Sequence, residues 1–234
     1  MNKIISIMML YLLAGGAAKA AVISWEIPEN IDLEDPTGDV SSNGILLYAY
    51  NFGDQDAGNG VGTTVTLGGT TFTTLSDSQG DDIELYNESG VEISFGTNMR
   101  TDTLPGGTTY DSANSYHQLL GSFQYNADET YSYLLNGLTW GTQYEVQFWS
   151  SDDRTVNRGQ YLDGNRMDTT AGQYMIGTFT ANEAFQAISL VTSASDETGQ
   201  MAAMQIRAIP EPGTLGLIAI FGGVILFIRR HLLI

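Results

Sequence analysis

Residues 143–149 read QYEVQFW, and the pattern of this stretch decides the class of fold. Its second, fourth and sixth residues are apolar, whereas Glu145 and Gln147 between them are polar. Successive side chains of a β-strand point to opposite faces of its sheet. The alternation therefore predicts a β-strand whose apolar side chains all lie on one face.

Comparable runs of branched and aromatic residues recur along the chain between turn residues. Residues 63–67 and 70–75 flank Gly68-Gly69, and such a pair takes the positive φ that tight hairpin turns require. Residues 91–95 alternate strictly, which predicts a half-buried strand. Further strands are expected at 45–52, 116–123, 131–135, 174–180, 185–192 and 202–208, and a short helix is expected near 111–119.

Eight to ten short strands with almost no helical periodicity predict an all-β fold. The architecture that we expect is an antiparallel, jelly-roll-like β-sandwich. Residues 21–209 form its body, and this length suits one domain with a sizeable core.

The beginning of the sequence has the pattern of a secretory signal peptide. Lys3 precedes an apolar stretch at 4–13, and Ala18-Lys19-Ala20 is the small-x-small pattern of a cleavage site. We expect residues 1–20 to be the signal peptide and cleavage by signal peptidase to expose Ala21. An uncleaved anchor is the alternative.

The end of the sequence combines three features in a fixed order. Pro210-Glu211-Pro212 cannot continue a strand or enter a helix, because proline fixes φ and lacks a donor. Residues 214–228 carry no charge, so we expect a transmembrane helix of about 22 Å, short for a hydrocarbon core of about 30 Å. Arg229 and Arg230 would act as the stop-transfer signal on the cytoplasmic side, which places the body outside the inner membrane.

This tail, residues 210–234, resembles the sorting signal of PEP-CTERM proteins, the Gram-negative exosortase substrates. The resemblance implies that an exosortase-like enzyme recognises Pro210, Glu211 and Pro212, and that the protein is associated with exopolysaccharide and the cell envelope or matrix. Residues 135–149, 152–154 and 172–180 are similar to a body domain that recurs in such proteins, which implies a β-sandwich of unassigned activity. A permanent membrane anchor with an incidental Pro-Glu-Pro is the alternative.

Charge and cysteine content exclude several classes of function. Residues 21–211 hold five basic and twenty-seven acidic side chains, a formal balance of −22. Such a balance repels nucleic acid, so DNA and RNA are set aside as partners. The chain has no cysteine, which excludes disulfides and thiol chemistry.

Candidates for catalysis are few. His117 is the only histidine outside the two terminal segments, so a multi-histidine zinc site cannot form, and a hydrogen-bonded or surface role is expected for it. The many carboxylates leave a glycosidase pair open, because such a pair is defined by separation in space. The doublets Asp81-Asp82 and Asp152-Asp153 are expected to be solvated loop charges.

Two weak ligand sites remain as hypotheses. Asp54, Asp56 and Asn59 resemble part of a calcium loop, without its closing Glu, and an Asx-rich turn is the simpler interpretation. Trp140 and Trp149, with Arg154, could bind a glycan, although strand aromatics are ordinarily core or rim residues. The further candidates of this kind are Tyr161, Tyr174, Arg158 and Arg166. For the arginines, pairing with nearby aspartates is the simpler interpretation.

These observations together predict an exported, non-enzymatic protein with a structural or adhesive body and no cofactor. It would be anchored in the inner membrane and then reach the cell surface or matrix after processing. The alternatives are a carbohydrate-binding module and a carbohydrate-active enzyme, a glycoside hydrolase or lyase.

Overall fold

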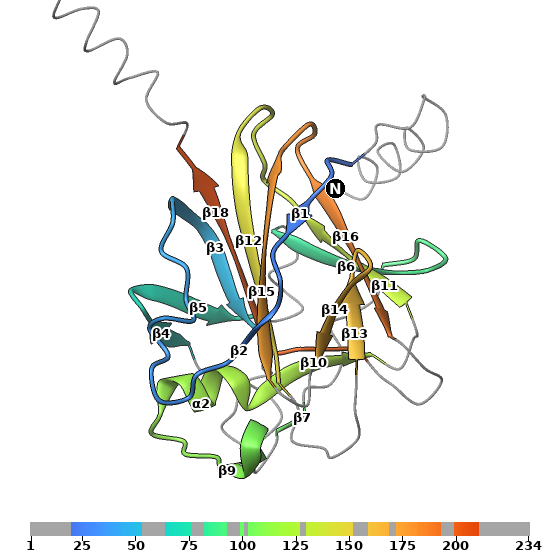
Figure 1. Cartoon of the computed structure of the whole chain (residues 1–234). Helices are drawn as coiled ribbons and strands as arrows, with labels where there is room; N and C mark the ends of the chain where they lie inside the picture. The colour runs from blue at the N-terminus through green and yellow to red at the C-terminus, as the bar shows by residue number, and fades with distance from the viewer. Residues whose placement is uncertain are drawn as a thin grey trace, which may run out of the picture.

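The protein is built mostly from β-strands, with one short α-helix among the residues that the structure describes (Figure 1). The computed structural model describes residues 20–52, 64–75, 82–92, 99–100, 103–126, 130–151, 159–168, 172–192 and 199–210. The helical elements are η1 (Pro105–Gly107) and α2 (Ser115–Leu120). The strands are β1 (Ser24–Trp25), β2 (Glu29–Asn30), β3 (Ile45–Asn51), β4 (Val65–Leu67), β5 (Thr70–Thr74), β6 (Ile83–Asn87), β7 (Met99–Arg100), β8 (Thr103–Leu104), β9 (Thr108–Thr109), β10 (Ser122–Asn126), β11 (Thr130–Leu135), β12 (Gln143–Ser150), β13 (Gly159–Leu162), β14 (Asn165–Asp168), β15 (Gln173–Thr180), β16 (Gln186–Thr192), β17 (Gly199–Met201) and β18 (Ala203–Ile209).

Two sheets contain most of the described strands. The larger has the order β1-β15-β12-β18-β3-β5-β4, with β2 also paired to β15, and the smaller has the order β14-β13-β16-β11-β6. Two short ladders, β17-β10-β7 and β8-β9, complete the described sheets. The pairing is antiparallel, as predicted, except that β3 and β5 run parallel.

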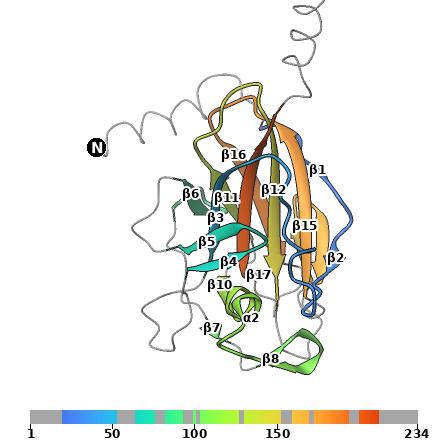
Figure 2. The ribbon, with the colours of Figure 1, turned by 90° about the vertical axis from the view of Figure 1, so that its left-hand side faces the viewer.

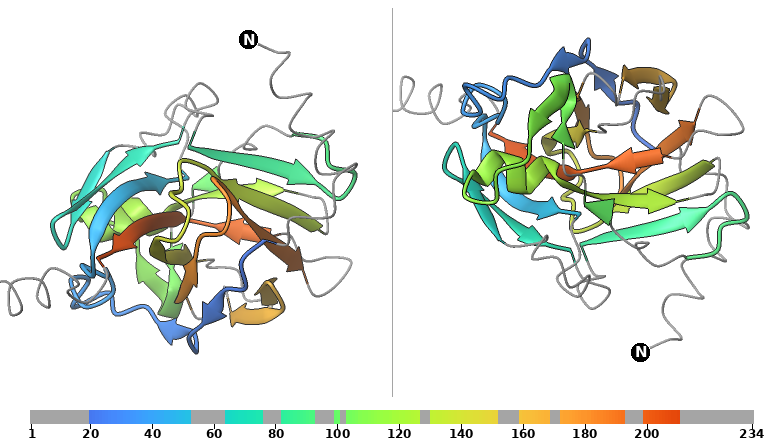
Figure 3. Two further views of the ribbon diagram at one scale, coloured as in Figure 1. Left: turned by 90° about the horizontal axis from the view of Figure 1, so that it is seen from above. Right: turned by 90° about the horizontal axis from the view of Figure 1, so that it is seen from below.

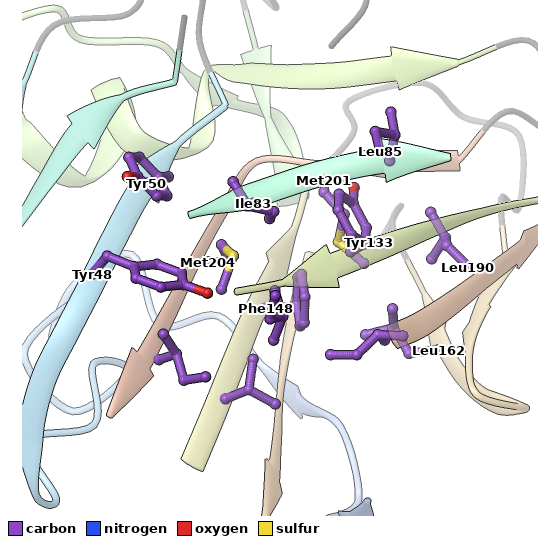
Figure 4. Close-up of a cluster of buried hydrophobic side chains, with 14 of the residues drawn as sticks. Tyr48, Tyr50, Ile83, Leu85, Tyr133, Phe148, Leu162, Leu190, Met201 and Met204 are labelled. Carbon is purple, nitrogen blue, oxygen red and sulfur yellow. The ribbon is translucent and has the colours of Figure 1, made fainter. Parts of the chain in front are cut away.

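The main core lies between the two sheets, as expected of a β-sandwich (Figure 4). Phe148 of β12 and Tyr133 of β11 come from opposite sheets, and their ring centroids are 5.4 Å apart. Phe52, the residue directly after β3, stacks on the same tyrosine with ring centroids 5.8 Å apart. Burial of large rings from both sheets supplies the dominant favourable term of such a fold.

The large sheet is also covered on its other face. Trp149 of β12 is fully buried there and packs edge-on against Phe72 of β5, with centroids 5.4 Å apart. Leu119 and Tyr116 of helix α2 belong to the same apolar cluster. Figure 3 shows the green helix α2 next to the teal strands β4 and β5 of this sheet, and helix α2 contacts β4. The central strands of this sheet are therefore buried on both faces.

Because both faces of the sheet are buried, the alternation in 143–149 does not separate a buried face from a solvent-exposed face. The side chains do point to opposite faces, but Glu145 and Gln147 are 7% and 1% exposed. Buried polar groups of this kind need hydrogen-bond partners. The partners come from the next strand, β18, and from the segment 39–44 that crosses this face.

Gln147 is bonded to the crossing segment at two points. Its Nε2 donates to the Asp39 carbonyl at 2.7 Å, and its Oε1 accepts from the Ser41 backbone N–H at 3.0 Å. The carboxylate of Glu145 accepts from the Ser41 hydroxyl and from Asn43 Nδ2. Gln205 Nε2 donates to Gln147 Oε1 at 2.8 Å and to the Ser41 carbonyl at 3.0 Å. These bonds tie the crossing segment to both strands.

Arg207 closes this network at the far end of β18. Its three guanidinium nitrogens donate to Gln205 Oε1, to the Gly44 carbonyl and to Thr70 Oγ1, at 3.2, 3.3 and 2.5 Å. Gly44 has φ +81°, and a Cβ there would lie 2.3 Å from the Ala208 carbonyl oxygen. Only glycine fits where the crossing segment meets β18.

Several local predictions are confirmed. Gly68 and Gly69 have φ values of 53° and 79° and join β4 to β5 as a hairpin. The helix expected near 111–119 is α2, and the Asn114 side chain caps it by accepting from the N–H groups of Tyr116 and His117.

Other local predictions differ from the structure. Residues 116–120 are helical, so the strand expected at 116–123 begins only at Ser122, as β10. Strand β6 was not expected. In the strand expected at 91–95, Val91 belongs to no strand, Glu92 makes only an isolated bridge to Tyr86, and residues 93–95 lie outside the described residues.

Replacing Arg207 by Met should lower the free energy of unfolding by about 2–4 kcal/mol, because buried acceptors lose their donor and Glu145 loses its nearby cation. Chemical denaturation of the full chain measures this change. The matched control is Arg166→Met on the exposed side of β14, which should change stability by less than about 0.5 kcal/mol. Equal effects of the two substitutions would contradict a structural role for the network.

Candidate functional site at one end of the sandwich

The last described strand ends directly before the expected sorting motif. Strand β18 lies between β12 and β3, and its last residue, Ile209, pairs with Gln143. The next residue, Pro210, is exposed. Proline has no N–H to donate to a ladder, so the strand pairing ends where the expected sorting motif begins. Glu211 and Pro212 lie outside the described residues, as do 214–228, Arg229 and Arg230.

The expected signal cleavage site lies at the same end of the sandwich (Figure 2). Ser24 of β1 pairs with Thr178, and extending that register places Ala21 beside the end of β15. The Ala21 carbonyl accepts a 3.0 Å hydrogen bond from Gln186 Nε2. Thr180 pairs with Gln143, which also pairs with Ile209, so the ends of β15 and β18 and the start of β12 lie in one row. Ala20 and Ala21 are half-exposed, and Ala18 lies outside the described residues.

The separation of the two chain exits follows from the strand order. β1 and β18 are separated by β15 and β12, which makes three strand spacings. At about 4.8 Å per spacing the exits lie roughly 14 Å apart. The two sites where we expect processing therefore face the same surroundings.

Buried charge holds the outgoing strand. Arg207 lies two residues before Ile209, opposite Glu145 in the β12–β18 ladder. Burial lowers the pKa of Arg207, and the nearby Glu145 carboxylate opposes that shift. The guanidinium stays protonated in proteins, so its three hydrogen bonds anchor the end of the strand.

The two tryptophans proposed as ligand residues have opposite environments. Trp140 is 76% exposed, in a turn fixed by a 2.8 Å bond from the Gly141 N–H to the Ala181 carbonyl. Trp149 lies in the second core, so its proposed role in surface stacking is wrong. The two indoles do not form one platform. Arg154 lies outside the described residues, and Tyr174, also buried, donates to a Glu29 oxygen at 2.7 Å.

His117 has a structural position. Its side chain is 7% exposed, and Nδ1 accepts from the Asp111 N–H at 3.0 Å, a bond that closes the loop leading into α2. Burial lowers the pKa of His117, while Asp111 opposes the shift. This agrees with the hydrogen-bonded role that the sequence favours.

The carboxylate candidates give no assembled centre in the described part of the chain. Within it, no three acidic or histidine side chains gather as metal ligands. Asp82 instead accepts from the Tyr50 hydroxyl at 2.5 Å. Asp81, Asp152 and Asp153 fall in undescribed segments, and so do the calcium candidates Asp54, Asp56 and Asn59.

Sequence reasoning missed a buried carboxyl, Asp39. Its Oδ2 accepts from the Tyr116 hydroxyl at 2.6 Å and from the Asp32 N–H at 2.7 Å. Burial raises the pKa of Asp39, although both hydrogen bonds oppose the shift. Asp39 occurs in the turn-rich stretch DPTGDV, and no local pattern there distinguishes it from a solvated turn residue.

No helix in the described ranges has the length and apolar character needed to cross a lipid bilayer.

Comparison with known proteins adds little. No family model and no curated protein matches the chain. Among solved structures, a calcium-binding mutant of Bacteroides uniformis beta-glucuronidase 2 aligns at TM-score 0.43 and 12% identity, over 70% of this chain and 18% of that chain. The same enzyme covalently bound to cyclophellitol-6-carboxylate aziridine aligns at TM-score 0.42 and 13% identity, with the same coverage. Similarity at this level carries no argument about function.

Replacing each tryptophan by alanine should distinguish the buried indole from the exposed one. Trp149→Ala should cost about 3–5 kcal/mol of unfolding free energy, because it removes a fully buried ring. Trp140→Ala should change stability by less than about 0.5 kcal/mol. Chemical denaturation of both full-length variants measures the difference. A larger loss at Trp140 than at Trp149 would contradict these assignments.

Asp39 should make stability depend on pH. The pKa of Asp39 is higher in the folded state than in the unfolded state. At pH values between these two pKa values the folded state binds more protons than the unfolded state, so the protein loses stability as pH rises from about 4 through the folded pKa. Asp39→Asn keeps an acceptor oxygen but does not ionise. The melting temperature of the variant minus that of the parent should therefore increase between pH 4 and pH 7. A difference that falls over this range would show the opposite shift.

Proposed function

We propose that this chain is an exported cell-envelope or matrix protein that an exosortase-like enzyme sorts and processes at Pro210, Glu211 and Pro212. Signal peptidase would first cut before Ala21, and the apolar run 214–228 would hold the chain in the inner membrane, with the body outside. The protein would then pass to the cell surface or matrix, in association with exopolysaccharide. The body itself acts as a structural or adhesive module, not as an enzyme.

One observation carries the proposal: the last described strand, β18, ends at Ile209, directly before the motif. Ile209 is still paired in a central strand, and Pro210 is already exposed. A processing enzyme needs an accessible segment, and the exposure of Pro210, the first residue of the motif, supports such access.

The positions of the two chain exits also fit the proposal. Before processing, both the signal peptide and the second apolar run would lie in one membrane. Ala21 and Pro210 at the same end let the body fold completely while both are inserted. Exits at opposite ends would require long linkers.

We further propose that the body has jelly-roll-like connectivity. The first long strand, β3, lies beside the last, β18, a closure typical of that architecture.

Replacing the Glu211 carboxylate by an amide tests whether the motif is needed for sorting. Glu211→Gln should leave the full-length chain in the inner-membrane fraction, whereas the parent reaches the outer fractions. Glu183→Gln, a half-exposed glutamate at the same end of the body, is the matched control and should be delivered normally. Membrane fractionation with immunoblotting against the body measures both. Normal delivery of Glu211→Gln would contradict recognition of the motif.

A further inference from the structure

Exposed apolar side chains gather at the end of the sandwich where the chain exits. Six large hydrophobic residues are exposed among the described residues. Four of them belong to this end, namely Val22, Ile45, Leu47 and Trp140. Scattered single residues of this type are normal on a surface, but their concentration at one end is not.

The strand register places each of the four. Ile45 pairs with Ala208, two residues before Pro210, and Leu47 follows at the bulge beside Arg207. Val22 directly follows Ala21. Trp140 belongs to the turn that leads into β12, whose first residue, Gln143, pairs with Ile209. Figure 1 shows the end of β18 and the starts of β3 and β12 at the top.

Two charged side chains of the neighbouring strands, Glu145 and Arg207, do not reach this surface, whereas Glu183 at the same end is half-exposed. Glu145 and Arg207 are both 7% exposed and bonded within the network beneath the crossing segment. Burying this end against an apolar surface would therefore not strip water from either charge. That matters because desolvating a charge is costly.

The sequence limits how far this end can lie from a membrane. Only residues 210–213 separate Ile209 from the apolar run that starts at Thr214. Four residues span at most about 14 Å when fully extended. The interfacial layer of a bilayer is itself about 5–7 Å thick on each side. A body tethered so closely stands at the headgroup level.

We propose that this end of the sandwich rests on the lipid surface, with the Trp140 indole at the boundary between headgroups and acyl chains. The proposal rests on the membrane anchoring that is part of the proposed function. Tryptophan suits this boundary because its ring is apolar and its N–H can face water. Val22, Ile45 and Leu47 would add apolar contact around it. The body would thereby hold Pro210 at the membrane surface.

Spin labelling tests the contact, since the chain has no native cysteine to remove. Thr139→Cys places a nitroxide beside Trp140, and Ser89→Cys places one in an exposed turn after β6, a strand that runs away from this end. The full chain is inserted into nanodiscs of phosphatidylcholine and phosphatidylethanolamine. Accessibility to oxygen and to an aqueous nickel chelate is then measured for both labels.

We expect the label at 139 to be protected from nickel and reached by oxygen, and the label at 89 to show the reverse. Adding Trp140→Ser should return the label at 139 toward water. Equal nickel accessibility at 139 and 89 in an inserted chain would overturn the lipid contact. The exposed apolar residues would then be assigned to contact with a protein partner. Failure of the chain to insert would overturn the anchoring as well, so the two failures are distinguishable.

Discussion

The hydrogen-bond network on the covered face of β12 and β18 is the constraint on which the rest depends. Glu145, Gln147, Gln205 and Arg207 are buried there, and each needs partners that water cannot supply. The segment 39–44 provides most of them through its backbone and through Ser41 and Asn43. Because the network reaches Arg207, it holds strand β18 almost to its last residue, Ile209, directly before the expected sorting motif.

This arrangement separates the protein into parts with different roles. The sandwich is held by a core between its sheets and by a second core beneath helix α2. Both chain exits lie at the opposite end from α2 in Figure 1, next to the exposed apolar residues. A body that presents its exits together suits a passenger delivered by signals at its two ends. The proposed sorting uses the tail, whose first residue, Pro210, is exposed.

The sequence predicts what short-range chemistry decides. The Gly68-Gly69 hairpin, the strand at 143–149 and the helix capped by Asn114 all follow from neighbours within a few residues. What it could not predict depends on distant contacts. Glu145 and Trp149 are buried because residues 39–44 and helix α2 cover that face of the sheet. The sequence of 143–149 does not indicate that other segments cover this face. The sequence signal for this burial was that two polar residues, Gln205 and Arg207, alternate with apolar residues in a strand.

The central claim is that residues 210–234 are a sorting signal to be processed and not a lasting anchor. Mass spectrometry of the mature protein recovered from its native cells tests it most directly. The account predicts an amino end at Ala21 and a final peptide that stops within or just after Pro210-Glu211-Pro212. A mature chain whose peptides continue through 214–228 to Ile234 would contradict it and would indicate a permanent membrane anchor.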